Sequence, residues 1–119
     1  MNFIELASVP SKPTDVPVND PDVTSDERIK VTYADPAPFN GGASIISYEL
    51  AIDDGMTGNF TSLVGYEPNS LLKVFTVEND LVIKGRNHRF RYRAKNVVGW
   101  SEWSENSFVL AARVPYQAD

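Results

Sequence analysis

Side chains able to do chemistry are few in this sequence of 119 residues. His88 is the one histidine and cysteine is absent, so there is neither a thiol nucleophile nor the set of histidine and cysteine ligands that zinc requires. Carboxylates are paired at Asp53–Asp54 and at Asp20/Asp22, but both pairs lie in turn-like sequence, where aspartate commonly bonds the local backbone. We therefore expect a protein that is not an enzyme and holds no cofactor and no metal ion.

The glycine-rich and acidic segments support the same expectation. Gly41–Gly42 and Gly55/Gly58 lack the lysine and the serine or threonine that a phosphate-binding loop requires. The acidic segment 20–27 offers oxygen ligands that would suit calcium. Its spacing matches no calcium loop, so we expect a solvated, turn-forming segment there.

Composition and charge exclude several classes of protein. Hydrophobic residues make up 42% and charged residues 23%, a mixture typical of one soluble globular domain. The net charge of −5 argues against broad nucleic-acid binding. The longest apolar runs, such as Phe108–Ala112, are too short to span a bilayer, and Met1–Pro10 lacks the basic start of a signal peptide. We expect neither nucleic acid nor direct membrane insertion.

Period-two alternation is the main signal for secondary structure. It is clearest over His88–Lys95, where Phe90, Tyr92 and Ala94 would point one way and a row of cations the other. The prolines from Pro10 to Pro21 suggest an extended segment that leads into an edge strand. Further strands are expected over residues 29–33, 46–53, 60–66, 74–77 and about 107–112. The pattern predicts an all-β, immunoglobulin-like sandwich of two antiparallel sheets with about seven strands.

Several motifs follow one another in an order and spacing that identify a family. They are Tyr33 with Pro36, Gly41–Ile45, Ser47–Leu50, Gly85, Phe90–Asn96 and Gly99 with Ser101. Together they resemble a fibronectin type III domain over about residues 10 to 114. The resemblance implies that strands A, B and E face strands C, C′, F and G.

Two residues depart from the family pattern. Tyr33 stands where the family usually has the tryptophan of strand B. His88 stands where the family usually has the tyrosine of the E–F corner, whose hydroxyl bonds the backbone. Because imidazole can also donate a hydrogen bond to a nearby carbonyl, we interpret His88 as a structural corner residue rather than a pH switch or a ligand.

The strongest local motif is Trp100–Ser104, which reads WSEWS and contains both tryptophans. It resembles the WSxWS motif that class I cytokine receptors carry between strands F and G. The two indoles, three residues apart, could fold back over the outward guanidinium groups of strand F, with cation–π contacts between them. Ser101 and Ser104 would be free to bond neighbouring backbone. This ladder would comprise Arg89, Arg91, Arg93, Trp100, Ser101, Trp103 and Ser104.

Two interpretations of this ladder remain open. It either covers a sheet face or forms a recognition surface, because tryptophan and arginine are enriched in binding hot spots. We favour the covering role. A cytokine receptor would pair this domain with a disulfide-bonded one, and no such domain is present in this sequence.

Two modification sites depend on secretion. Asn59-Phe60-Thr61 is a sequon for N-glycosylation at Asn59. The Trp-x-x-Trp pattern makes Trp100 a candidate for C-mannosylation.

An internal similarity suggests a tandem array. Phe3–Pro10 resembles Phe108–Pro115 at a constant offset, so the first copy would be the last strand of a preceding repeat. We expect a remnant of that repeat at 1–9, a domain at 10–114, and a linker to a following repeat at 115–119.

The leading hypothesis is a non-catalytic module of such an array, acting as a spacer and in protein–protein interaction. Flanking fibronectin type III domains and an unidentified protein would be its partners, and the isolated domain would be a monomer. An extracellular or cell-surface location is expected, with the cytoplasm as the other possibility. A ligand-binding, membrane-proximal domain of a cytokine-receptor-like protein and an accessory module of a larger enzyme are the alternatives.

Overall fold

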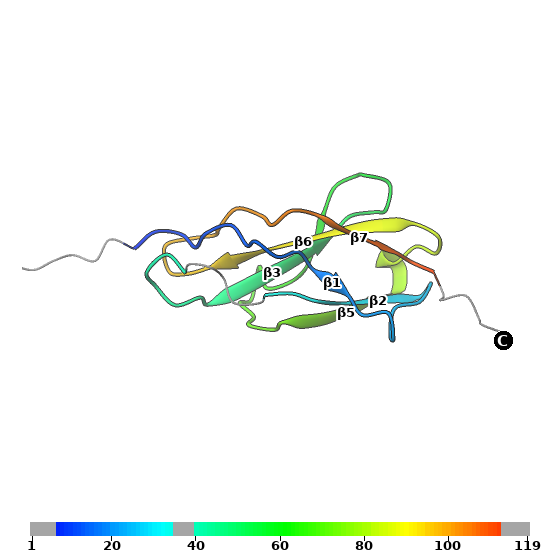
Figure 1. Ribbon diagram of the computed structural model, residues 1–119, viewed down its shortest axis with the longest axis horizontal. Helices are drawn as coiled ribbons and strands as arrows, with labels where there is room; N and C mark the ends of the chain where they lie inside the picture. Colours follow the sequence, from blue (N-terminus) through cyan, green and yellow to red (C-terminus); the bar gives the residue numbers. More distant parts are fainter. Residues whose placement is uncertain (1–6, 35–39, 113–119) are drawn as a thin grey trace, which may run out of the picture.

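A computed structural model describes residues 7–34 and 40–112, in which two antiparallel sheets pack face to face (Figure 1). The smaller sheet has the strand order β1-β2-β5, with bounds Val18–Asn19, Arg28–Thr32 and Val74–Glu78. The larger sheet has the order β4-β3-β6-β7, with bounds Thr61–Val64, Ser47–Ile52, Asn87–Lys95 and Ser107–Leu110. One 3₁₀ turn, η1 (Asn79–Leu81), follows β5. The predicted sandwich is confirmed, with the expected grouping of strands.

β6 shows the alternation of buried and more exposed side chains that its sequence predicted. From His88 to Lys95 its even-numbered residues are buried and its odd-numbered residues are half-buried. Phe90 and Tyr92 therefore enter the core between the sheets, where the ring of Tyr92 lies 5.6 Å from that of Tyr33. Burial raises the pKa of the Tyr33 hydroxyl to about 12. Tyr33 thus fills the core directly after β2, as its place in the sequence suggested.

β3 differs from the prediction. Its sequence alternates, but all six of its residues are buried. Leu50 and Ile52 face the core. On the outer face, the Ser47 hydroxyl bonds the Gly65 carbonyl and the Glu49 carboxylate binds the Arg93 side chain. Glu49 is only 4% exposed, although it lies on the outer face of the sheet. The alternation predicted the two faces correctly but could not show that the outer one is covered.

The segment before β1 packs along the domain. Pro10, Pro13 and Pro17 are buried, and Lys12 forms an ion pair with Glu105. Figure 1 shows this segment running beside the chain that leads into β7. The prolines, which lack a backbone donor, suit a stretch that covers a sheet edge without joining it.

A backbone clamp fixes the start of this segment. The backbone amide of Ser8 donates to the Gly41 carbonyl at 2.8 Å. The side-chain amide of Asn96, which is buried, donates to the Ser8 carbonyl at 2.7 Å. Gly41 has a φ of 81°, and a Cβ there would collide with the Ser8 carbonyl oxygen. The similarity between 3–10 and 108–115 falls partly outside the described residues.

The described chain enters and leaves at opposite ends of the long axis (Figure 1). Ala7 lies near the turn between β6 and β7, beside Gly42, and Ala112 follows β7 at the other end. Within residues 7–34 and 40–112 no helix is long and apolar enough to cross a membrane.

Candidate functional site: an aromatic–cation ladder

A tight turn after β6 brings both tryptophans back onto the sheet. The Asn96 side-chain oxygen accepts the backbone amides of Val98 and Gly99 at 2.9 and 3.2 Å. The backbone amide of Asn96 donates to the Gly99 carbonyl. The chain then reverses, and Trp100 pairs with Lys95. This turn sets the register in which the indoles meet the cations of β6.

The two indoles interleave with two guanidinium groups. Arg93 lies between Trp100 and Trp103, with its central carbon 4.4 and 4.3 Å from the ring centroids. Arg91 lies between Trp103 and Phe60, at 4.2 and 3.9 Å. The ladder in the structure is thus a continuous stack of these five side chains, in place of the seven residues expected. Phe60, from the loop before β4, was not predicted as a member.

Both ends of the ladder have further contacts. Lys95 places its ammonium 5.3 Å from the Trp100 ring centroid, and the Tyr66 ring lies nearly parallel to Trp100, with centroids 6.1 Å apart. At the other end Arg89 lies 4.8 Å from the Phe60 ring centroid. Arg89, expected to contact the indoles, lies instead over Phe60.

Two serines join the segment Trp100–Ser104, which carries both tryptophans, to β6. The Ser101 hydroxyl accepts the Ala94 amide and the Ser104 hydroxyl accepts the Tyr92 amide, each at 3.0 Å. Their own amides donate to the carbonyls of Ala94 and Tyr92 at 2.7 and 2.8 Å. Both serines are buried. The segment therefore supplies side-chain acceptors where a neighbouring strand would supply backbone carbonyls.

The two arginines of the ladder differ in their polar partners. Arg93 binds the buried Glu49 carboxylate through Nε and Nη2, at 2.8 and 2.7 Å. Arg91 has no carboxylate partner among the described residues, and its Nε is buried without a hydrogen-bond acceptor. Burial, then repulsion from Arg93 and Arg89, lowers the pKa of Arg91. Where Arg93 has a carboxylate, Arg91 has the rings of Phe60 and Trp103 on its two sides.

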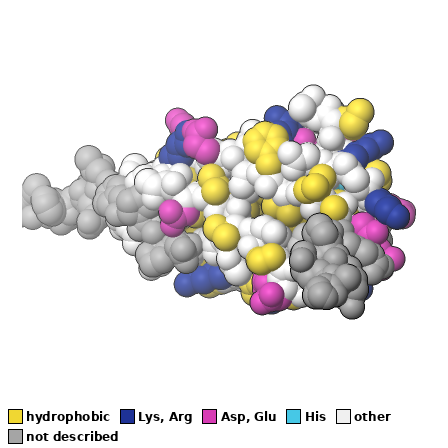
Figure 2. Space-filling model, turned by 45° about the vertical axis from the view of Figure 1, so that its right-hand side comes forward, with side chains coloured by type: hydrophobic (Ala, Val, Ile, Leu, Met, Phe, Trp, Pro, Cys, Tyr) yellow, Lys and Arg dark blue, Asp and Glu magenta, His cyan; other side chains and the backbone are white. Residues whose placement is uncertain are grey.

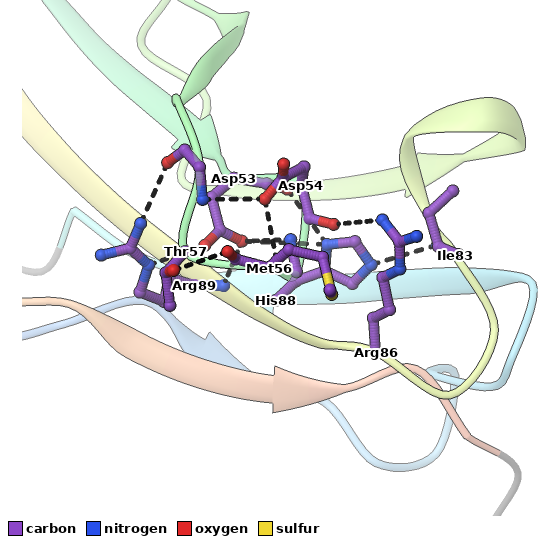
Figure 3. A network of polar contacts seen from close by, with 10 residues as sticks. Asp53, Asp54, Met56, Thr57, Ile83, Arg86, His88 and Arg89 are labelled. Carbon is purple, nitrogen blue, oxygen red and sulfur yellow. Dashed lines mark hydrogen bonds and ion pairs between the residues drawn. The ribbon is translucent and has the colours of Figure 1, made fainter.

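Beside the ladder, Asp53 organises the loop between β3 and β4 (Figure 3). Its carboxylate accepts the Arg89 side chain at 2.6 Å and the amides of Arg89 and Gly55 at 2.8 and 2.9 Å. Burial opposes the charge of Asp53, but these hydrogen bonds outweigh it and lower its pKa. Asp54 similarly accepts the amides of Met56 and Gly58. Asp54 thus bonds local backbone, as expected, whereas Asp53 also binds Arg89 of β6.

His88 joins two loops beneath the same network (Figure 3). Its Nδ1 donates to the Asp53 carbonyl at 3.0 Å, and its Nε2 accepts the Ile83 amide at 3.1 Å, which requires the neutral Nδ1–H tautomer. The imidazole is 0% exposed. The bond to Asp53 reaches the residue that follows β3. The bond from Ile83 links His88 to the connection between β5 and β6, where the corner residue was expected.

The remaining candidate residues lie away from the ladder or form local pairs. Asn59 is exposed, in the loop before β4. In the acidic segment Asp20 pairs with Lys30 at 3.4 Å and Asp26 with Lys84 at 3.6 Å. Among the described residues, no group of three or more histidine, aspartate or glutamate side chains is placed to hold a metal ion.

No protein-family model matches the chain. Among solved structures, a fourth fibronectin type III domain of a human protein has a TM-score of 0.76 at 22% identity, with 98% of this chain and 90% of that chain covered. Domains A168–A170 of titin give 0.73 at 20%, covering 90% and 34% of the two chains. The twitchin kinase region from C. elegans gives 0.70 at 23%, covering 88% and 17%. The fold is that of a fibronectin type III domain.

The fibronectin type III fold is thereby established from structure as well as from the sequence pattern. This chain spans about a third of the titin structure and under a fifth of the twitchin structure. At these identities the similarity concerns the fold alone. The comparisons therefore give no role to the ladder, the clamp at Asn96 or the Asp53 network, which are features of this chain's own side chains.

Proposed function

We propose that this chain is a non-catalytic fibronectin type III module that acts as a spacer in a multidomain protein and makes protein–protein contacts there. The observation that carries the proposal is that the described chain, from Ala7 to Ala112, enters and leaves at opposite ends of the long axis. A module with this arrangement lengthens a chain when copies follow one another. The titin and twitchin structures that contain similar domains are themselves multidomain, which supports the proposal.

The charged side chains that might do chemistry already have structural partners. Glu49 binds Arg93, and Asp53 binds Arg89. Both nitrogens of His88 are engaged by backbone groups. A catalytic acid or base must exchange protons with a substrate, and groups held in this way are poorly placed to do so. These contacts support a module without catalytic activity.

The domain limits and surroundings follow from the same proposal. The proposed module spans residues 10–114, with a remnant of a preceding repeat at 1–9 and a linker to a following one at 115–119. Within that remnant, Ser8 is bound to this module through Gly41 and Asn96. Flanking fibronectin type III modules are its neighbours, and the isolated module is a monomer in dilute solution. We place the parent protein outside the cell or at its surface. Glycosylation at Asn59 and C-mannosylation at Trp100 then become accessible, and the intact mass of protein from its native host tests both.

The spacer role is tested by joining two copies of the full chain head to tail through their own ends. Small-angle X-ray scattering should show an elongated particle whose maximum dimension is close to twice that of one copy. The matched control carries Asn96→Ala in the second copy, which loosens the clamp on Ser8 and should broaden the distribution of lengths. A compact particle with the two modules side by side would overturn the spacer role.

A second candidate is an accessory module of a larger enzyme. The twitchin kinase region contains a similar domain beside a kinase, and another similar structure is described as titin kinase and its flanking domains. A catalytic domain elsewhere in the parent protein would favour this candidate. A cysteine-containing domain before this one, with a single membrane span after it, would instead favour a receptor.

A further inference from the structure

Four strands lie at sheet edges, and three of them are protected against pairing with another chain. β1 has only two residues and stands between Pro17 and Pro21. β4 pairs with β3 through an irregular register. β5 lies between the charged Lys73 and its own last residue, Glu78. Short length, proline, irregular pairing and charge are the usual devices that keep sheet edges from associating.

β7 is also short, with four residues, but it lacks the proline, the charge and the irregular pairing of the other edges. Its sequence, Ser107–Leu110, contains no charge and no proline. Phe108 and Leu110 are 60% and 54% exposed, whereas Val109 between them faces the core. On the face shown in Figure 2, exposed hydrophobic side chains lie over the middle and charged ones lie mainly toward the margins. An uncharged apolar edge of this kind is a template for strand addition.

The register shows which backbone groups β7 leaves unpaired. Ala111 exchanges hydrogen bonds with Gly85 and Arg86 on the β6 side, so Val109 and Ser107, at alternate positions, also face β6. Phe108 and Leu110 therefore direct their amides away from the sheet. No other strand of the described chain pairs with β7 on that side.

We propose that β7 is a homodimerisation edge, at which the β7 strands of two copies pair antiparallel about a twofold axis through Val109. Phe108 of each copy then lies opposite Leu110 of the other. The Phe108 amide of each copy donates to the Leu110 carbonyl of the other, which also accepts the Ala112 amide of its own chain, and the Leu110 amide donates to the Phe108 carbonyl. The side chains of each pair pack on the same outer face. A twofold axis requires a surface that complements itself, and this uncharged apolar strand meets that requirement.

A second copy suits this edge better than an unrelated ligand because one strand supplies both halves of the contact. The contact is small, since four residues per copy fall well short of the roughly 800 Å² per partner that a stable interface buries. We therefore expect a weak dimer that forms as concentration rises, which agrees with a monomer in dilute solution. The proposal does not depend on the spacer role.

Analytical ultracentrifugation of the full chain over a range of concentrations tests association. The wild-type chain should be a monomer when dilute and a growing fraction of dimer as it approaches about 1 mM. The variant Phe108→Lys/Leu110→Lys places lysines directly opposite lysines in both pairs, so its dimer affinity should fall by about tenfold or more. The matched control is Leu71→Lys, at a leucine with 57% exposure outside any strand, and it should associate like wild type.

A charge exchange makes the test specific. The variant Phe108→Glu/Leu110→Glu should also be monomeric alone, but mixing it with the lysine variant should restore a dimer. In the wild type, exchange of the Phe108 and Leu110 amides with solvent should slow as concentration rises, whereas the Val109 amide stays protected throughout. A wild-type chain that remains monomeric up to about 1 mM overturns the proposal. So does a dimer that the lysine pair leaves unchanged, or a mixture that does not associate.

Discussion

Arg93 binds the carboxylate of Glu49 at 2.8 Å while lying between the indoles of Trp100 and Trp103. One guanidinium thus serves a carboxylate on β3 and two aromatic rings from the segment after β6. This relationship explains why Glu49 is buried on the outer face of a sheet. Through Arg93 the aromatic stack is also connected to a buried carboxylate.

Glu49→Gln should destabilise the domain by about 1 to 2 kcal/mol at pH 7. The amide keeps the shape of the side chain but removes the charge that neutralises Arg93. The loss stays below that of a fully buried pair because Arg93 keeps some contact with water. Urea unfolding measures the change. Glu102→Gln, at an exposed neighbour of the tryptophans, is the control and should change stability little. Equal stabilities of the two variants would show that the ion pair contributes nothing.

Asp53 should make the domain sensitive to acid. Its pKa in the folded state lies below the usual 3.8, so its carboxylate stabilises the fold at pH values above that figure. This stabilisation is lost as the pH falls through the lowered pKa. The difference in unfolding free energy between wild type and Asp53→Asn should therefore be largest near neutral pH and shrink below about pH 4. Unfolding curves from about pH 2 to pH 7 measure it.

The control for this pH series is Asp15→Asn, at an exposed aspartate. Its difference from wild type should stay small at every pH. A difference for Asp53→Asn that is constant with pH, or that grows in acid, would contradict the assignment of Asp53 as a stabilising carboxylate.

His88→Phe should cost about 2 to 4 kcal/mol of stability. Phenylalanine keeps the ring but leaves the Ile83 amide and the Asp53 carbonyl without their buried partner. Thermal melting at pH 7 checks the loss, with Asn87→Ala at the exposed neighbouring position as the control. A variant as stable as wild type would mean that His88 fills space only.

The fold could be predicted from the sequence because the signals for strands are local. Phe90, Tyr92 and Ala94 define the inner face of β6, and the residues between them define the outer face. Turn residues such as Gly55, with a φ of 78°, mark where strands end. The ladder's two tryptophans and Arg91 and Arg93 were found in the same way, since all four lie at alternating or closely spaced positions near one turn.

Contacts between distant segments could not be predicted. Phe60 joins the ladder from the loop before β4, and Tyr66, two residues after β4, stacks on Trp100, but neither position carries a local signal. Asp53 was assigned to a turn, and its bond to Arg89 depends on the register between β3 and β6. Arg89 was therefore grouped with the indoles, although a nearer carboxylate holds it.

The central claim is that the ladder is part of the folded structure, and the melting temperature of Trp103→Ala tests it most directly. Trp103 contacts both Arg91 and Arg93, so its loss removes two cation–π contacts and uncovers the outer face of the sheet. We expect a loss of about 2 to 4 kcal/mol, or roughly 10 to 20 °C in Tm, with partial recovery in Trp103→Phe. An unchanged melting temperature would contradict the account and indicate that the tryptophans form a free recognition surface.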